Sequence, residues 1–220
     1  MIGMPGHSWS GPLPPLTPGQ QLTHDNLERH VAELAGRIGE RNVWRPEALA
    51  AASGYIRKTL EAAGYPVSVQ PFTSRGQTVN NLEAILPGNA ATDEIIVIGA
   101  HYDSVAGTPG ANDNASGVAT LLELARLLAG TTLPRSVRFV AFVNEEAPFF
   151  YGDEMGSKRY ADRAHAQGER IEAMLSLETI GYYTDQEDSQ RYPFPFNLFY
   201  PETGNFTGFV GDLSSWLLVR

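Results

Sequence analysis

Six histidine, aspartate and glutamate residues of this 220-residue chain stand at or just after predicted strand ends or in a neighbouring loop, and such side chains bind divalent metals in proteins. They are His101, Asp103, Asp113, Glu145, Glu146 and Glu178. Clustered carboxylates repel one another, and at least one would take up a proton unless a cation lies among them. Nitrogen and oxygen donors without sulfur suit zinc, with manganese or cobalt as alternatives. The residue types therefore predict a metal site, provided that the fold brings these side chains together.

The spacing of these residues suggests a division of roles. His101 and Asp103 are two positions apart, so in extended chain both side chains leave the same face, and Asp103 can accept the second ring N–H of His101. Of Glu145 and Glu146, only one can face a metal squarely, which leaves the other free as a general base. Asp113 has two oxygens and can bridge two ions.

Each of these motifs also has a structural interpretation. A histidine–aspartate pair at a strand end is commonly a surface pair, and two adjacent glutamates are commonly a solvated turn. The segment 110–117 can be a simple turn and helix cap. Their occurrence at successive predicted strand ends favours the metal site over these alternatives.

Three runs that are apolar, the second apart from Arg138 and the third more weakly, indicate strands that are covered on both faces. The runs are 95–100, 137–143 and 171–177. Apolar periodicity predicts helices over about 24–40, 46–63, 116–129 and 157–166, and alternation predicts half-buried strands at 67–69 and 82–86. Strands alternating with helices predict an α/β fold whose mixed sheet is mostly parallel, with helices on both faces. Ligands then gather beyond the carboxyl ends of the strands.

Composition and local pattern predict how the chain is divided and which kinds of partner are excluded. Residues 1–20 are predicted to be an irregular arm rich in Pro and Gly, residues 21–220 a single α/β domain, and 209–218 a final helix. The net charge of −9 argues against a nucleic-acid partner. The absence of cysteine excludes a disulfide scaffold and a cysteine nucleophile. Without a membrane-length apolar run or a signal-peptide pattern, we expect a cytoplasmic protein that is not membrane-bound.

The motifs together resemble the family of co-catalytic zinc exopeptidases, family 28 of the metallopeptidases. That family includes bacterial leucyl aminopeptidases and glutamate carboxypeptidases. The segments that carry the resemblance are NLEAILPG, IIVIGAHYDS, TPGANDNASGVATLLELAR, RFVAFVNEE, MGSKRY and LETIGYY. Their order and their spacing are far more specific than any one motif.

The resemblance implies a mixed-sheet α/β fold and two zinc ions. It implies that His101 binds the first zinc and that Asp113 bridges both. Glu146 would bind the second zinc, and Glu145 would be the general base and acid. Glu178 stands where the family usually has aspartate, and it would complete the shell of the first zinc. The family also has a cis peptide after the bridging aspartate.

The chain departs from the family in one respect. The last zinc ligand of the family is a histidine far downstream, and none of the five histidines here follows Glu178. We therefore expect a C-terminally truncated chain without the last strands, with one tightly bound zinc at most and weak or absent activity. His165 is a poor substitute, because it lies in a polar helical stretch away from any strand end.

The expected reaction is hydrolysis of a terminal peptide bond in a peptide substrate. An aminopeptidase is favoured over a carboxypeptidase. Two alternatives stay open, a non-catalytic relative that acts by binding and a zinc enzyme like glutaminyl cyclase. A serine hydrolase has no support, because the chain has no G-x-S-x-G motif. The aromatic residues Phe149, Phe150 and 192–200 are predicted either to line a substrate pocket or to join the core.

Overall fold

The computed structural model of the protein describes residues 12–90, 93–212, 214–215 and 218. Residues 23–181 form one compact unit, which contains every candidate metal ligand. Residues 1–22 and 182–220 form a second unit, whose described part holds one short 3-10 helix, Phe196–Leu198. The site is built entirely within the first unit, so the fold of that unit is described here.

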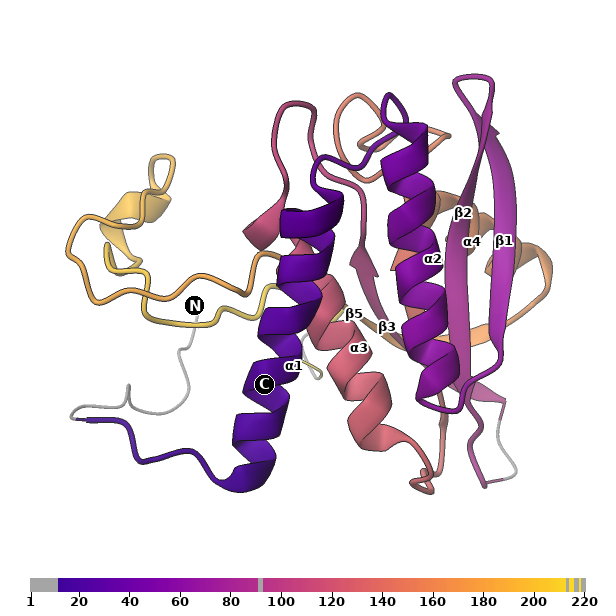
Figure 1. The fold of residues 1–220 in the computed structure, drawn as a ribbon, viewed down its shortest axis with the longest axis horizontal. Coiled ribbons are helices and arrows are strands. Elements are labelled where there is room, and N and C mark those ends of the chain that lie inside the picture. The colour runs from indigo at the N-terminus through magenta and orange to yellow at the C-terminus, as the bar shows by residue number, and fades with distance from the viewer. Residues whose placement is uncertain (1–11, 91–92, 213, 216–217, 219–220) are drawn as a thin grey trace. The chain divides into compact units, whose positions relative to one another are not determined.

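A mixed sheet runs through the unit (Figure 1). Its strands are β1 (Val67–Ser74), β2 (Gln77–Leu86), β3 (Glu94–His101), β4 (Ser136–Phe142) and β5 (Arg170–Ser176). The spatial order is β1-β2-β4-β3-β5. β2 pairs antiparallel with both β1 and β4, whereas β3 pairs parallel with β4 and with β5. β2 therefore runs against the other four strands, and the predicted fold class is confirmed.

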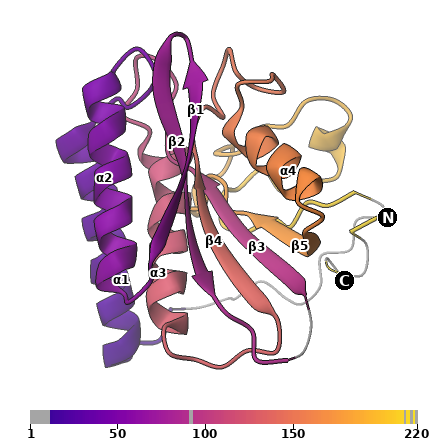
Figure 2. The ribbon, with the colours of Figure 1, turned by 90° about the vertical axis from the view of Figure 1, so that its right-hand side faces the viewer.

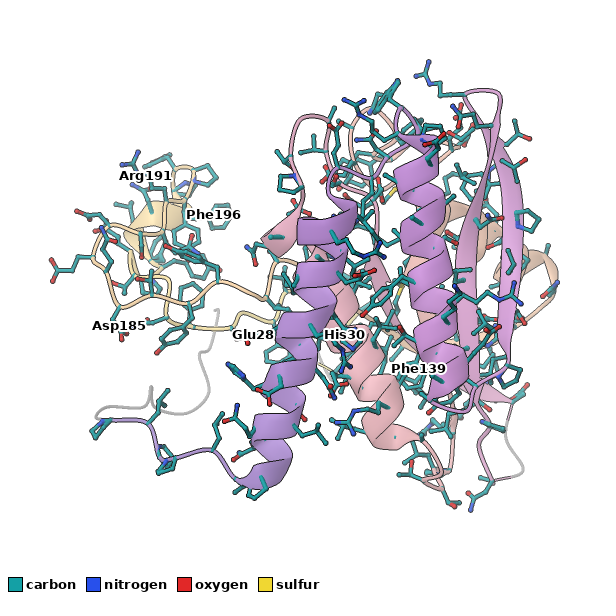
Figure 3. The ribbon with its side chains drawn as sticks, viewed as in Figure 1. Glu28, His30, Phe139, Asp185, Arg191 and Phe196 are labelled. Atoms are coloured by element: carbon teal, nitrogen blue, oxygen red, sulfur yellow. The ribbon has the colours of Figure 1, made fainter. Side chains whose placement is uncertain are left out.

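Helices cover both faces of this sheet, as Figure 2 shows. They are α1 (Pro18–Val31) with a π-helical continuation η1 (Ala32–Ile38), α2 (Pro46–Ala62), η2 (Ala111–Ser116) with α3 (Gly117–Leu128), and α4 (Gly156–Ala166). The main core lies between the sheet and the helices α2 and α3, where Phe139 of β4 is fully buried (Figure 3). A smaller core lies under α4, where the rings of Phe142 and Tyr160 meet edge to face.

The first helix begins earlier than its sequence predicts. The apolar stripe indicated a start near residue 24, but α1 begins at Pro18. Thr17 and Gln20 explain the difference, because the Thr17 N–H donates to Gln20 Oε1 (2.9 Å) and the Gln20 N–H to Thr17 Oγ1 (3.4 Å). This reciprocal pair is a capping box, and Pro18 suits the first helical position. Residues 18–20, predicted as part of the arm, are therefore helical.

The other predicted elements lie within two residues of their expected bounds, apart from β1, which ends five residues later, β2, which begins five residues earlier, and the final helix. Residues 1–11 of the predicted arm lie outside the described residues, and 12–17 have no regular structure. Of the helix predicted over 209–218, residues 209–212 are irregular and part of the remainder is not described. Among the described helices, none has both the length and the apolar character needed to span a bilayer.

Candidate metal centre

The candidate ligands meet because three parallel strands end at the same edge of the sheet. His101 is the last residue of β3, and the loops after β4 and β5 carry Glu145 and Glu178. Asp113 comes from η2, where its backbone leaves helical geometry (φ −108°, ψ 98°). The peptide bond between Asp113 and Asn114 is cis, as the resemblance implied.

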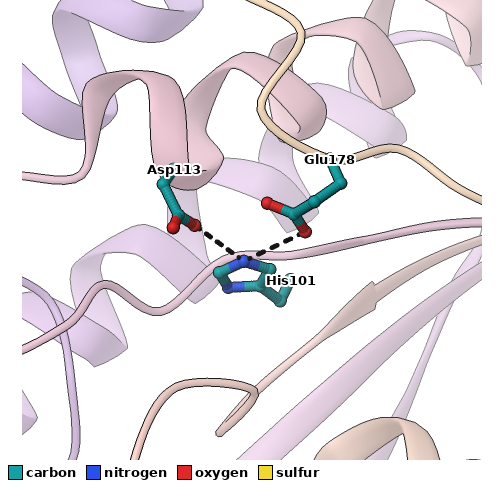
Figure 4. Close-up of side chains that lie close together, drawn as sticks. All are labelled: His101, Asp113 and Glu178. Atoms are coloured by element: carbon teal, nitrogen blue, oxygen red, sulfur yellow. Dashed lines mark ion pairs between the residues drawn. The ribbon is translucent and has the colours of Figure 1, made fainter. Parts of the chain in front are cut away.

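The ring of His101 is the centre of this cluster (Figure 4). Its Nε2 lies 3.1 Å from Asp113 Oδ1, 3.4 Å from Glu178 Oε2 and 3.7 Å from Glu145 Oε2. The ring is buried, and Nε2 has no hydrogen-bond partner among the described residues. A buried ring nitrogen without a partner, aimed at three carboxylates, has the arrangement expected of a metal ligand.

Asp103 supports the cluster from behind. Its carboxylate is buried, and Oδ1 lies 3.4 Å from His101 Nδ1. That contact lacks hydrogen-bond geometry, because Nδ1 also has no hydrogen-bond partner in the described chain. The two oxygens instead accept the backbone N–H groups of Glu145 (3.1 Å) and Glu146 (3.2 Å). Asp103 thus ties the loop after β4 to the end of β3, while its predicted role in fixing the His101 tautomer stays a prediction.

The two glutamates after β4 point to different partners. Glu145 faces His101, whereas Glu146 Oε1 accepts the backbone N–H of Val105 at 3.1 Å. His101, Glu145 and Glu146 also form a group whose ligand atoms lie within 4.8 Å of one another. The structure therefore places both glutamates beside the same imidazole.

Asn114 fixes the distance between the loop of Asp113 and the loop of Glu178. Its side chain is fully buried, and Nδ2 donates to Leu177 O (2.8 Å) and to Glu178 Oε2 (3.2 Å). Its Oδ1 accepts the N–H groups of Gly117 (3.1 Å) and Thr179 (3.3 Å). Asn114 joins the end of β5 to the start of α3, and so holds Asp113 and Glu178 at a fixed separation from each other.

Electrostatics within the cluster favour a bound cation. Burial lowers the pKa of His101, but the surrounding carboxylates outweigh it and raise that pKa to about 12. Burial and the charge of Asp113 raise the pKa of Glu146 to about 7, and burial raises the pKa of Glu145. The contact with His101 lowers the pKa of Asp113. The cluster therefore holds extra protons near neutral pH when no cation neutralises it.

The described residues contain two groups of three potential metal ligands, and His101 belongs to both. The groups are His101, Asp113 and Glu178, and His101, Glu145 and Glu146. Two other histidines lie elsewhere: His30 is buried against Tyr55, and His165 is exposed on α4. The rejection of His165 as a ligand agrees with that position.

Sequence reasoning missed two residues that shape the site. Asn114 stands inside a motif that the resemblance uses, yet nothing in its local pattern shows that it contacts residues 63 and 64 positions away. Arg41 lies in the loop before α2 and has no motif around it, but its side chain is fully buried beside the site. Of the aromatic residues predicted either to line a pocket or to join the core, Phe149 joins the core and Phe150 is half exposed.

Known proteins are similar to this chain in sequence and in fold. The sequence profile of peptidase family M28 matches residues 81–200. An uncharacterised Escherichia coli protein, YfbL, is 38% identical over 96% of this chain and 66% of its own length. The aminopeptidase YwaD of Bacillus subtilis is 36% identical over 52% of this chain and 24% of its own length. The chain thus spans at most about two thirds of the curated relatives it matches.

Solved structures of other proteins have a similar fold. A zinc aminopeptidase from Bacillus subtilis superimposes with a TM-score of 0.65 at 17% identity, over 76% of this chain and 74% of that protein. A glutaminyl cyclase from Fimbriiglobus ruber superimposes with a TM-score of 0.56 at 25% identity, over 69% and 60% of the two chains. The fold and the site define an α/β protein with a cluster of potential metal ligands at one edge of its mixed sheet. Because the family profile covers more than half of the sequence, the chain belongs to peptidase family M28.

Proposed function

We propose that this protein is a zinc-dependent exopeptidase and that it removes residues from the amino termini of peptides. The observation that carries the proposal is the buried, unpartnered Nε2 of His101 with three carboxylates within 3.7 Å. Membership of a peptidase family and the aminopeptidase name of a 36% identical relative support the reaction class.

His101, Asp113 and Glu178 are the residues that would hold the first ion. Their donor atoms lie within 4.8 Å of one another, and the mixed nitrogen and oxygen set suits zinc. Asp113 would also bind a second ion, and Glu146 would be a further ligand of that ion. We propose that the first ion binds tightly and the second weakly to this chain, because the two carboxylates that the described residues offer it are few ligands for zinc.

The residues around the ion divide the catalytic work. A bound zinc ion is a Lewis acid that polarises the scissile carbonyl and makes a water molecule more acidic. Glu145 faces His101 Nε2. We propose that Glu145 would accept a proton from the attacking water and pass it to the leaving amine. Asp103 accepts the backbone N–H of Glu145 and lies 3.4 Å from His101 Nδ1, and we propose that it holds these two residues in place. The side chains of Asp113 (52% exposed) and Glu178 (44%) form the side open to solvent, from which a peptide would enter.

The test is hydrolysis by the full chain before and after metal removal. The purified protein is stripped with a chelator, and then assayed with aminoacyl-anilides, N-acyl dipeptides and a peptide with N-terminal glutamine, with and without added Zn²⁺. We expect zinc-restored release of aniline from the aminoacyl substrates. Cleavage of the N-acyl dipeptides alone would identify a carboxypeptidase, and cyclisation of glutamine without hydrolysis would identify a cyclase. No turnover with a full complement of zinc would contradict the proposal.

A further inference from the structure

An arginine with a buried side chain, Arg41, lies beside the candidate metal centre. Arg41 has a fully buried side chain, in the loop between η1 and α2. Buried arginines are normally paired with carboxylates. The contacts of this guanidinium are instead to backbone carbonyl oxygens, those of Leu34, Gly39, Tyr102, Pro109 and Gly110.

These carbonyl groups belong to the chain segments that carry the metal ligands. Tyr102 stands between His101 and Asp103, and Arg41 Nε donates to its carbonyl oxygen at 2.7 Å. Gly110 stands three residues before Asp113, and Arg41 Nη2 donates to its carbonyl oxygen at 2.9 Å. One planar group therefore joins the end of β3 to the loop that delivers Asp113.

The backbone around Arg41 strengthens this junction. Its N–H donates to Ser104 Oγ (3.2 Å), and its carbonyl oxygen accepts the N–H of Ser104 (2.9 Å). Gly110 has a left-handed conformation (φ 58°), and a Cβ there would lie 2.4 Å from the carbonyl oxygen of Asp113. The loop is therefore closely packed at this point, and the Gly110 carbonyl oxygen accepts the N–H of Ala115 (3.1 Å) as well as that of Arg41 Nη2.

We propose that Arg41 is a positioning residue for the metal centre: its guanidinium fork holds His101 and Asp113 at the separation that a shared ion requires. The inference rests on the proposed function only for the identity of the metal. A lysine keeps the charge at this position, but its single ammonium group cannot reach two separate chain segments in the planar geometry of arginine. The geometry of the fork, rather than the charge alone, is therefore the property under test.

The experiment measures metal affinity in the full chain without substrate. Zn²⁺ and Co²⁺ are titrated against a competing chelator into wild type, Arg41→Lys, Arg41→Met and the control Arg138→Lys, and the Co²⁺ absorption spectrum reports the ligand geometry. Arg138 is a matched control, because it is a largely buried arginine paired with Glu169 (2.6 Å) and Glu83 (3.4 Å). Its Nη1 donates to the Tyr160 hydroxyl of α4 at 3.2 Å, and α4 covers the other face of the sheet from α3 (Figure 2).

We expect both Arg41 variants to bind metal at least about tenfold more weakly, as when groups that orient metal ligands are removed. Their Co²⁺ spectra should also differ from that of wild type. Arg138→Lys should unfold at a lower temperature but keep wild-type affinity. Wild-type affinity in Arg41→Lys, with or without a loss in Arg41→Met, would overturn the positioning role.

A milder variant keeps the test decisive if the Arg41 variants do not fold. Ser104→Ala removes the hydroxyl that accepts the Arg41 N–H and donates to Thr108 O (3.1 Å). It should weaken metal binding by a smaller factor and leave the unfolding temperature in chelator close to that of wild type. Unchanged affinity in Ser104→Ala would contradict the proposal in that case. Because affinity is read without substrate, a chain that binds metal but hydrolyses no peptide would refute only the proposed reaction.

Discussion

Glu145 and Glu146 are neighbours in the sequence, yet their carboxylates have different surroundings. Glu146 accepts the backbone N–H of Val105, whereas Glu145 faces His101 Nε2 at 3.7 Å. Burial raises the pKa of both carboxyl groups, that of Glu146 to about 7, so their contacts and not their pKa values distinguish them. These contacts support the proposed division, in which Glu146 binds an ion and Glu145 moves a proton.

Glu145→Gln tests this division, because the amide keeps the size of the side chain but cannot accept a proton. We expect zinc content to stay at the wild-type level and kcat to fall by about 10²–10⁴. Elemental analysis and steady-state assays on the same preparations give the two values. Glu47→Gln, on the exposed first turn of α2, is the matched control and should keep full turnover. If Glu145→Gln kept wild-type turnover, Glu145 would have no part in proton transfer.

The sequence predicts the candidate ligands better than the residues that hold them. His101, Glu145 and Glu178 follow apolar strands, and the shared edge of a parallel sheet brings such residues together whatever their distance in sequence. Arg41 and Asn114 act through contacts to residues 61 to 69 positions away, which no local pattern encodes. Their roles become visible only when the loops are placed in space.

At the scale of elements, the packing of α1 depends on polar residues. The apolar stripe of Leu27, Val31, Leu34 and Ile38 predicted the helix, and Leu34 is fully buried in the main core with Val31 and Ile38 packed against it. The buried residues of α1 itself are Asn26 and His30. His30 Nδ1 lies 2.6 Å from the Tyr55 hydroxyl of α2, and Nε2 lies 3.8 Å from Glu123 Oε1 of α3. The period thus predicts the helix and its apolar contact with the core, whereas the contacts of His30 with two other helices are visible only in the structure.

This junction should make stability depend on pH. Burial, with the nearby charges of Arg29 and Arg126, lowers the pKa of His30 from 6.5, and Glu123 opposes that shift only in part. On acidification, the imidazole of His30 therefore becomes protonated near pH 6.5 in the unfolded chain, but only at lower pH in the folded chain. The contribution of His30 to stability is thus full above pH 6.5 and falls as the pH drops through the window below it.

His30→Gln should remove that step. Urea unfolding in chelator on either side of pH 6.5 gives the change in unfolding free energy, and we expect a smaller fall on acidification in the variant than in wild type. His165→Gln, at an exposed position on α4, is the control and should keep the wild-type fall. Equal falls in wild type and His30→Gln would show that the junction has no part in the pH dependence.

At the scale of the whole molecule, the order of the strands decides whether a metal site exists. β3 lies between β4 and β5, so the strand that ends in His101 has a carboxylate-bearing loop on each side. The alternation of strands and helices predicted a mostly parallel sheet, but it did not fix which strands are neighbours. That order follows from crossovers between distant segments, and it makes the site a junction of four elements.

A metal at this junction should stabilise the whole unit, because its ligands exist together only in the folded chain. A ligand that binds only the folded state adds about 2.7 kcal/mol at a hundredfold excess over its Kd. For a chain of this size that corresponds to a rise of about 5–10 °C in the melting temperature. We expect calorimetry to show such a rise when Zn²⁺ is added to chelator-treated wild type. His101→Ala removes the ligand common to both candidate groups and should abolish the rise. A rise of equal size in His101→Ala would mean that zinc binds elsewhere, and would remove the imidazole from the metal centre.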